Sequence, residues 1–296
     1  MTLLDILPSL RDTTRPRLDP TIWPLTTGVD GLGRITVGRV ALTDIADEYR
    51  TPAYVLDETD FRTRARRYRG ALGQTEVVYA GKSLLTTSVA RWAAEEGLGV
   101  DVCSAAELAT ALAGGVDPAR IVLHGNAKSC DELRDAVDVG VGRIVIDSPM
   151  EITYLAGLVR RPQPVLIRVT PDIDIHGHRA VTTGVTDQKF GFALADRRAA
   201  RAAARILATP NLDLIGLHCH IGSQITDPAP YGEAVHRLIG AMADIRAEHG
   251  VLLTELNIGG GHGVPHVRGD ASLDTAAFGA VVDDALTTAC AAERFP

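Results

Sequence analysis

The chain has 296 residues, a formal net charge of −7, a hydrophobic fraction of 46% and a charged fraction of 23%. This length and composition are typical of one large globular domain, or of one domain with an appendage. The negative charge argues against nucleic-acid binding and against recruitment to an anionic membrane, and no apolar run approaches the length of a membrane span.

The N-terminal residues contain Asp5 and lack a basic segment that leads into an apolar core, so we expect no signal peptide. The four cysteines are widely spaced and form no C-x-x-C pair. These features indicate reduced thiols in a cytoplasmic protein.

The first part of the chain predicts an appendage. About thirty residues rich in Pro, Thr and Asp suggest an extended arm, and residues 34–42 predict a strand pair that turns at Gly38. We therefore assign residues 1–50 to an N-terminal arm and strand pair, and residues 51–296 to the main domain.

From residue 53 onward, apolar strands alternate with helices. The predicted strands are residues 53–56, 77–80, 99–103, 121–124, 143–147, 165–169, 214–221 and 255–258. The predicted helices cover residues 58–72, 87–96, 105–113, 131–139, 149 onward, 197–207, 231–248 and 273–292. This alternation predicts a parallel sheet covered on both faces. Eight strands suit a (β/α)8 barrel, with an open doubly wound sheet as the alternative.

Polar residues recur where the predicted strands end. In a barrel, catalytic residues collect at this rim, which favours the barrel over the open sheet. The strand-end residues are Lys82, Asp101, His124, Asp147, Arg168, His220 and the loop Gly259–Gly261.

Lys82 follows an apolar strand directly after Gly81. Lysine is strongly hydrated and seldom lies beside a core strand. One reason for such a position is a Schiff base with a carbonyl cofactor such as pyridoxal 5'-phosphate (PLP). The alternative is a side chain that reaches from the strand end into solvent, and for Lys82 alone this alternative is favoured.

Other residues at the rim also allow two interpretations. The glycines Gly259–Gly261 let backbone N–H groups approach a phosphate, or form only a flexible connection. His220 can stack on a planar ring while Ser223 reaches a phosphate, or His220 is a buried structural residue. Arg168 and Lys189 are anion partners or members of structural salt bridges.

Two acidic residues and several histidines complete the candidates. Asp101 and Glu107 can orient Lys82 or a cofactor, although Glu107 also fits the capping box of the helix that begins after Ser104. Histidine pairs occur at His176/His178 and His218/His220, but the chain has no H-x-x-x-H helix and no carboxylate cluster at ligand spacing. We therefore expect no catalytic metal.

Six motifs in order make the chain resemble the PLP-dependent amino-acid decarboxylases with an alanine-racemase-like barrel. The resemblance runs from about Ile35 to the C-terminus. The motifs are Tyr79-Ala80-Gly81-Lys82; Asp101-Val102-Cys103-Ser104 with Glu107-Leu108; His124-Gly125-Asn126 with Lys128-Ser129; Asp187-Gln188-Lys189-Phe190-Gly191; Gly216-Leu217-His218-Cys219-His220-Ile221-Gly222-Ser223-Gln224; and Ile258-Gly259-Gly260-Gly261.

The resemblance implies a PLP site built at the rim. Lys82 would carry the cofactor, His220 would stack on its ring, and Ser223 with Gly259, Gly260 and Gly261 would hold its phosphate. Asp101, Glu107 and Arg168 match supporting positions near the cofactor, and His124, Asn126 and Lys189 match motif positions without an assigned role.

The resemblance also implies a reaction. Within the family, the motifs fit the branch that decarboxylates meso-diaminopimelate to L-lysine and CO2, a step of lysine biosynthesis in which the PLP ring accepts the electrons. The Asp187–Gly191 and Gln224 matches favour this substrate. The alternatives are a related decarboxylase or racemase that acts on another basic amino acid, and a PLP-binding remnant without activity.

The chain departs from the family in what it lacks. The family continues with a Glu-Pro-Gly-Arg strand, whose glutamate faces the pyridine nitrogen, and with a β-rich C-terminal domain on which the N-terminal arm packs; neither is present here. The family usually forms a homodimer in which a cysteine of that domain enters the partner's site. The resemblance places residues 53–56 outside the barrel, which leaves seven of eight strands, so we expect an incomplete barrel with weak activity or none. Ser83 and His262 stand where the family has alanine and an apolar residue.

Overall fold

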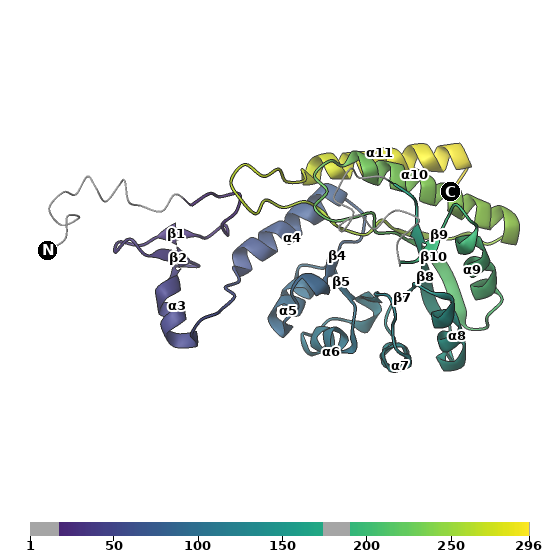
Figure 1. Cartoon of the computed structure of the whole chain (residues 1–296), viewed down its shortest axis with the longest axis horizontal. Helices are drawn as coiled ribbons and strands as arrows, with labels where there is room; N and C mark the ends of the chain where they lie inside the picture. The colour runs from purple at the N-terminus through teal and green to yellow at the C-terminus, as the bar shows by residue number, and fades with distance from the viewer. Residues whose placement is uncertain (1–17, 174–189, 296) are drawn as a thin grey trace. The chain divides into compact units, whose positions relative to one another are not determined.

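The computed structural model describes residues 18–173 and 190–295 (Figure 1). The described chain divides into two compact units. One contains the residues up to Arg66 together with Pro265–Ala271, and the other contains Arg67–Val264 together with the residues from Ser272 onward. The domain boundary that the sequence places at residue 50 stays a prediction.

The first unit contains a small antiparallel sheet, ordered β1 (Gly28–Val29), β2 (Ile35–Val37) and β3 (Val40–Ala41), followed by α3 (Leu42–Tyr49). The strand pair that turns at Gly38 is therefore confirmed.

The strand predicted at residues 53–56 is wrong, because these residues form no strand. A β-strand is stabilised by backbone hydrogen bonds to a neighbouring strand, and this segment has no such neighbour in the described part of the chain. Its Tyr54 side chain is 94% exposed.

The second unit is an α/β structure with one curled parallel sheet, an open half-barrel (Figure 1). Seven strands pair in the order β11-β10-β8-β7-β6-β5-β4, each parallel to its neighbours, and the short β9 (Phe192–Ala193) pairs with the end of β8. The seven strands are β4 (Val78–Ala80), β5 (Gly99–Val102), β6 (Ile121–Leu123), β7 (Arg143–Ile146), β8 (Gln163–Thr170), β10 (Leu212–His218) and β11 (Glu255–Asn257).

Helices precede, connect and follow the strands of the sheet, as the sequence predicts. They are α4 (Glu58–Leu72), α5 (Thr87–Glu95), α6 (Ala105–Ala113), α7 (Cys130–Val139), α8 (Pro149–Leu158), α9 (Arg198–Leu207), α10 (Ala229–His249) and α11 (Thr275–Glu293). Three of them begin at a serine shortly after a strand ends. The hydroxyls of Ser104, Ser129 and Ser148 each accept a hydrogen bond from the backbone N–H three residues later, which stabilises the helix start.

Among the described residues, β4 and β11 each pair with only one strand of this sheet, so the barrel is open, as the resemblance implies. A hydrophobic cluster of Val122, Val145 and Leu166 joins β6, β7 and β8. Val78 of β4 and Ile215 of β10 pack against this cluster, which therefore links strands from both halves of the sheet. None of the described helices is both long enough and apolar enough to cross a membrane.

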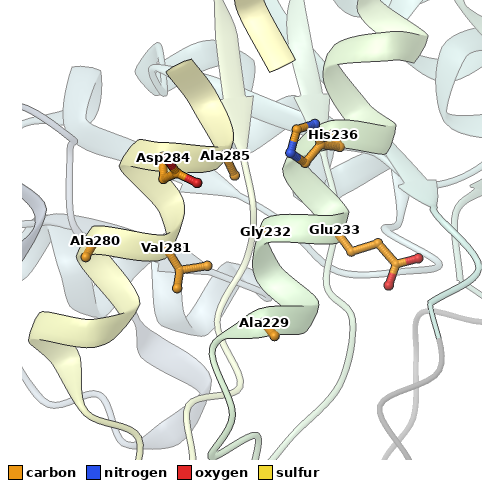
Figure 2. A pocket seen from close by; sticks show the side chains of 8 residues that line it. All are labelled: Ala229, Gly232, Glu233, His236, Ala280, Val281, Asp284 and Ala285. Carbon is orange, nitrogen blue, oxygen red and sulfur yellow. The ribbon is translucent and has the colours of Figure 1, made fainter. Parts of the chain in front are cut away.

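Helices α10 and α11 pack closely and leave a groove of about 410 Å³ between them (Figure 2). The close packing depends on Gly232, because a Cβ atom there would lie only 3.1 Å from the Val281 side chain. Small side chains line most of the groove. In Figure 2 the Glu233 side chain points away from α11, whereas His236 and Asp284 extend toward the space between the two helices.

Truncation of Leu166 to alanine tests the core. Leu166 is fully buried, so Leu166→Ala is expected to lower the free energy of unfolding by about 2–5 kcal/mol through the lost transfer energy and the cavity left behind. Urea denaturation measures the loss. The matched control is Leu252→Ala, because Leu252 is 43% exposed and should change stability by less than about 0.5 kcal/mol. Equal losses in the two variants would contradict the assigned core.

Candidate functional site

Lys82 lies on a rigid turn directly after β4. The turn, η1 (Gly81–Ser83), is held by the Ser83 hydroxyl, which donates to the Ala80 carbonyl at 2.8 Å, and by the Tyr79 hydroxyl, which donates to the Leu84 carbonyl at 2.7 Å. Gly81 is required, because a Cβ atom there would lie 2.9 Å from the Asp101 carbonyl oxygen. The Lys82 side chain is exposed, so a fixed backbone presents an accessible amine.

The positive charge of Lys82 acts on the histidines at the end of β10. Burial, together with the nearby Lys82 and Arg168 charges, lowers the pKa of His220 to about 3. Burial also holds the pKa of His218 well below its usual value, with Lys82 among the contributing charges. Both imidazoles are therefore neutral at neutral pH, and Lys82 lies near enough to His220 for its charge to act on the ring.

Three buried polar atoms around His124 and His218 have no hydrogen-bond partner among the described residues. His124 Nδ1 lies 3.2 Å from Asp101 Oδ2, and the His124 ring packs against the His218 ring at 4.5 Å between centroids. Asp101 Oδ1, His124 Nε2 and His218 Nδ1 remain without a partner. Buried polar groups are rarely left unpaired, so these atoms are suited to a polar ligand.

Glu107 forms only part of the capping box that the sequence offers as its alternative, because its carboxylate accepts from Cys103 and not from Ser104. Its backbone N–H donates to the Ser104 hydroxyl, and its Oε2 accepts a hydrogen bond from the Cys103 backbone N–H at 2.7 Å. A Cβ atom at Gly81 would lie 3.6 Å from the same oxygen, so Glu107 is close to the Lys82 turn. Its role toward a cofactor stays a prediction.

Arg168 is buried on β8 and forms an ion pair. Its Nη1 lies 3.1 Å from Asp147 Oδ1, and its guanidinium stacks on the Phe190 ring at 4.4 Å from the centroid. Asp147 is in turn held by Glu151, whose Oε2 accepts a hydrogen bond from the Asp147 backbone N–H at 2.8 Å. The salt-bridge interpretation of Arg168 is thus confirmed, while a contact with a cofactor stays a prediction.

A buried lysine, Lys128, supports this network from the loop that follows β6. Lys128 Nζ lies 2.9 Å from Glu151 Oε2 and donates to the carbonyls of Gly125 at 2.6 Å and Val145 at 2.7 Å. Sequence reasoning did not assign a role to Lys128 and missed Glu151. The available signal was the pattern Ser148-x-x-Glu151, which marks a helix start but does not reveal a buried ion pair.

The glycine loop after β11 packs directly on His220. A Cβ atom at Gly259 would lie 2.3 Å from the Cys219 carbonyl oxygen and 3.2 Å from His220 Nδ1. A Cβ atom at Gly261 would lie 3.2 Å from His220 Cε1, and both glycines have positive φ angles, 72° and 99°. Only glycine fits here. The loop, His220 and the exposed Ser223 therefore occur together, as the resemblance implies.

Several sequence predictions lie outside the described residues, namely those for Lys189, for His176 and His178, and for the Asp187-Gln188 part of its motif. Among the described residues, Asp101, Cys103 and His124 offer ligand atoms within 4.8 Å of one another. Burial and the charges of Asp101 and Glu107 raise the pKa of Cys103 to about 11. Its thiol is thus protonated at neutral pH.

The site geometry is accompanied by clear similarity to known proteins. The family model described as "Pyridoxal-dependent decarboxylase, pyridoxal binding domain" matches residues 58–295. A diaminopimelate decarboxylase of Actinosynnema pretiosum subsp. auranticum is 46% identical over 296 residues, which cover 100% of this chain and 67% of the relative. A diaminopimelate decarboxylase of Mycobacterium tuberculosis is 44% identical over 261 residues, covering 86% of this chain and 58% of the relative.

Solved structures agree with these relatives. A diaminopimelate decarboxylase from M. jannaschii in complex with L-lysine has a TM-score of 0.81 and 25% identity, covering 90% of this chain and 64% of that one. Lysine decarboxylase from Selenomonas ruminantium has a TM-score of 0.74 and 25% identity, covering 86% of this chain and 64% of that one. The chain spans only between 56% and 67% of the length of the curated relatives it matches.

Breaking the buried ion pair tests its structural role. Lys128→Met is expected to lower the free energy of unfolding by about 3–5 kcal/mol, because Glu151 is left buried without its cation. The double variant Lys128→Met/Glu151→Leu removes both charges and should recover part of the loss in urea denaturation. Equal losses for the single and double variants would show that the two charges are not coupled.

Acidification tests the half-buried His262. Burial lowers the pKa of His262 from 6.5 to about 4, so between these pH values the unfolded chain binds more protons than the folded one. Stability must therefore fall as pH falls through this window, with a contribution of up to about 1.4 kcal/mol per pH unit.

Urea denaturation at pH 7, 6 and 5 measures this dependence. His262→Leu is expected to make it less steep, with the remaining slope due to His218 and His220, whereas Tyr68→Phe keeps the histidine and should retain the steeper slope. Tyr68 is the matched control because its hydroxyl lies 2.9 Å from His262 Nδ1. A slope for His262→Leu equal to that of the unmodified chain would exclude His262 as a source of the pH dependence.

Proposed function

Because this chain belongs to the pyridoxal-dependent decarboxylases, whose pyridoxal-binding domain it matches over residues 58–295, we propose that it binds PLP on Lys82 and acts on meso-diaminopimelate. The proposed reaction releases one carboxylate as CO2 and yields L-lysine. The observation that carries this proposal is the position of Lys82, an exposed amine on a rigid turn whose charge acts on His220 beside the glycine loop.

The residues at the rim fit the three parts of PLP. Lys82 is the amine for its aldehyde. The neutral His220 offers an imidazole face for the ring, and a neutral ring stacks without carrying a second positive charge next to Lys82. The backbone of Gly259–Gly261 and the exposed Ser223 hydroxyl suit its phosphate, since glycines allow close backbone approach to an anion. Bound PLP supplies an electron sink for the electrons of the broken Cα–carboxylate bond.

The remaining polar groups hold this arrangement in place. Asp101 Oδ1 and His124 Nε2 are buried and unpaired, and we assign them to hydrogen bonds with the cofactor or the substrate. Arg168 is oriented by Asp147, so its guanidinium contributes positive potential at the rim without being free to move. Glu107 keeps the end of β5 in position through the Cys103 backbone.

The substrate and the assembly rest on the relatives. Two curated relatives are named diaminopimelate decarboxylase, and one related structure holds L-lysine, the expected product. By analogy we propose a small basic amino acid as the ligand, a homodimer as the assembly and the cytoplasm as the location. A second candidate function is PLP binding without turnover.

Borohydride trapping tests the cofactor. Reduction of the chain with PLP is expected to add one pyridoxyl group to the peptide that contains Lys82, as measured by mass spectrometry. The assignment is unambiguous, because the chain has only two other lysines, Lys128 and Lys189. Lys82→Arg should abolish the label. A label on another lysine, or none, would contradict PLP binding at Lys82.

Release of CO2 from a panel of amino acids then separates the two functions. Turnover of meso-diaminopimelate above that of L-lysine, L-ornithine and L-arginine is expected for the first candidate. Labelling of Lys82 without turnover of any of them would support the second. Faster turnover of another amino acid in the panel would contradict the proposed substrate.

A further inference from the structure

The carbonyl groups of the glycine loop are held by the protein. The Tyr231 hydroxyl donates a hydrogen bond to the Gly260 carbonyl at 3.0 Å, and the Ile225 backbone N–H donates to the Gly261 carbonyl at 2.9 Å. Both donors approach the loop from the segment that follows β10. The orientation of two successive peptide groups is therefore set by contacts outside the loop.

In the same loop, the backbone N–H groups at the two ends donate hydrogen bonds, whereas those between them do not. Gly259 N–H donates to Asn257 Oδ1 at 2.9 Å, and Gly263 N–H donates to the Ile225 carbonyl at 2.8 Å. The N–H groups of Gly260, Gly261 and His262 donate to no acceptor in the described part of the chain. Successive backbone N–H groups of this kind form an anion-binding concavity.

The planarity of the peptide group links these two observations. In a trans peptide, the C=O of one residue and the N–H of the next point in opposite directions. The hydrogen bond from Tyr231 to the Gly260 carbonyl therefore directs the Gly261 N–H away from Tyr231. In the same way, the hydrogen bond from the Ile225 N–H to the Gly261 carbonyl directs the His262 N–H away from Ile225.

Tyr231 is itself fixed by its surroundings. It is fully buried on α10, and its ring makes edge contacts with Phe278 at 5.0 Å and His262 at 5.4 Å between centroids. Burial raises the pKa of Tyr231 above its usual range, so the hydroxyl remains a hydrogen-bond donor. An aromatic ring held on two sides places this hydroxyl at a defined point under the loop.

We propose that Tyr231 is a positioning residue for the cofactor phosphate, because its hydroxyl holds the Gly260 carbonyl and thereby presents the Gly261 N–H to the anion. The inference rests on the proposed binding of PLP and adds a residue that does not itself touch the cofactor. It concerns the phosphate alone, since Tyr231 orients a peptide group of the loop and not the ring of His220.

The comparison of PLP with pyridoxal, which lacks the phosphate, tests this role. Tyr231→Phe removes only the hydroxyl and keeps the buried ring. We expect it to weaken PLP binding about tenfold, as for the loss of one well-aligned hydrogen bond to a charged group, while pyridoxal binding is unchanged. Absorbance titration of both ligands with the full chain measures the two affinities.

Tyr68→Phe is the matched control. Tyr68 belongs to the same aromatic cluster and stacks on His262 at 5.4 Å, but its hydroxyl lies next to the His262 ring nitrogen and not next to a loop carbonyl. We expect the ratio of PLP to pyridoxal affinity to be unchanged in this variant. Thermal unfolding of both variants shows that they are folded.

The outcomes separate the inference from the proposed function. An unchanged ratio in Tyr231→Phe, with PLP bound by the unmodified chain, would overturn the role of Tyr231 and leave PLP binding intact. Equal weakening of PLP and pyridoxal would show a structural role only, and would also overturn it. An unmodified chain that binds neither ligand would overturn the proposed function and the inference together.

Discussion

Close contact between backbones at the carboxyl ends of the strands is the constraint on which the candidate site depends. A Cβ atom at Gly81 would lie 2.9 Å from the Asp101 carbonyl oxygen, and one at Gly261 would lie 1.9 Å from the Gly222 carbonyl oxygen. A larger residue at either position must displace a strand end or a loop. The Lys82 turn and the glycine loop are therefore positioned by main-chain packing, which is less variable than the placement of a long side chain.

The buried positive charges around the rim, Arg168 and Lys128, are each paired with a carboxylate. Arg168 and Lys128 are buried and paired with Asp147 and Glu151, respectively. A buried ion pair stabilises a fold less than its short distance suggests, because desolvation offsets much of the attraction. These pairs matter more for geometry. Glu151 contacts both the Lys128 amine after β6 and the Asp147 backbone after β7, and Asp147 in turn pairs with Arg168 of β8, so the three successive strand ends are connected.

Local sequence patterns were enough to predict much of the fold and the place of the site. Apolar strands alternating with capped helices predicted the parallel sheet, and Lys82, Asp101 and His220 were recognised because each ends a strand. Pairings between distant residues were not accessible. Arg168 with Asp147, and Tyr231 with the Gly260 carbonyl, join residues 21 and 29 positions apart, and no periodic pattern encodes such contacts. The prediction of a strand at residues 53–56 is wrong because β-propensity is a local property, and a strand also needs a neighbouring strand to pair with.

The contacts of Tyr231 also determine the point during protein synthesis at which the candidate site can form. Lys82 and β4 belong to the first part of the sheet, whereas the glycine loop follows β11 and its support includes Phe278 of α11. A ribosome makes the chain from the N-terminus, so the amine emerges long before the loop and the ring that hold an anion opposite it. Nearly the whole barrel unit must leave the ribosome before its parts can act together.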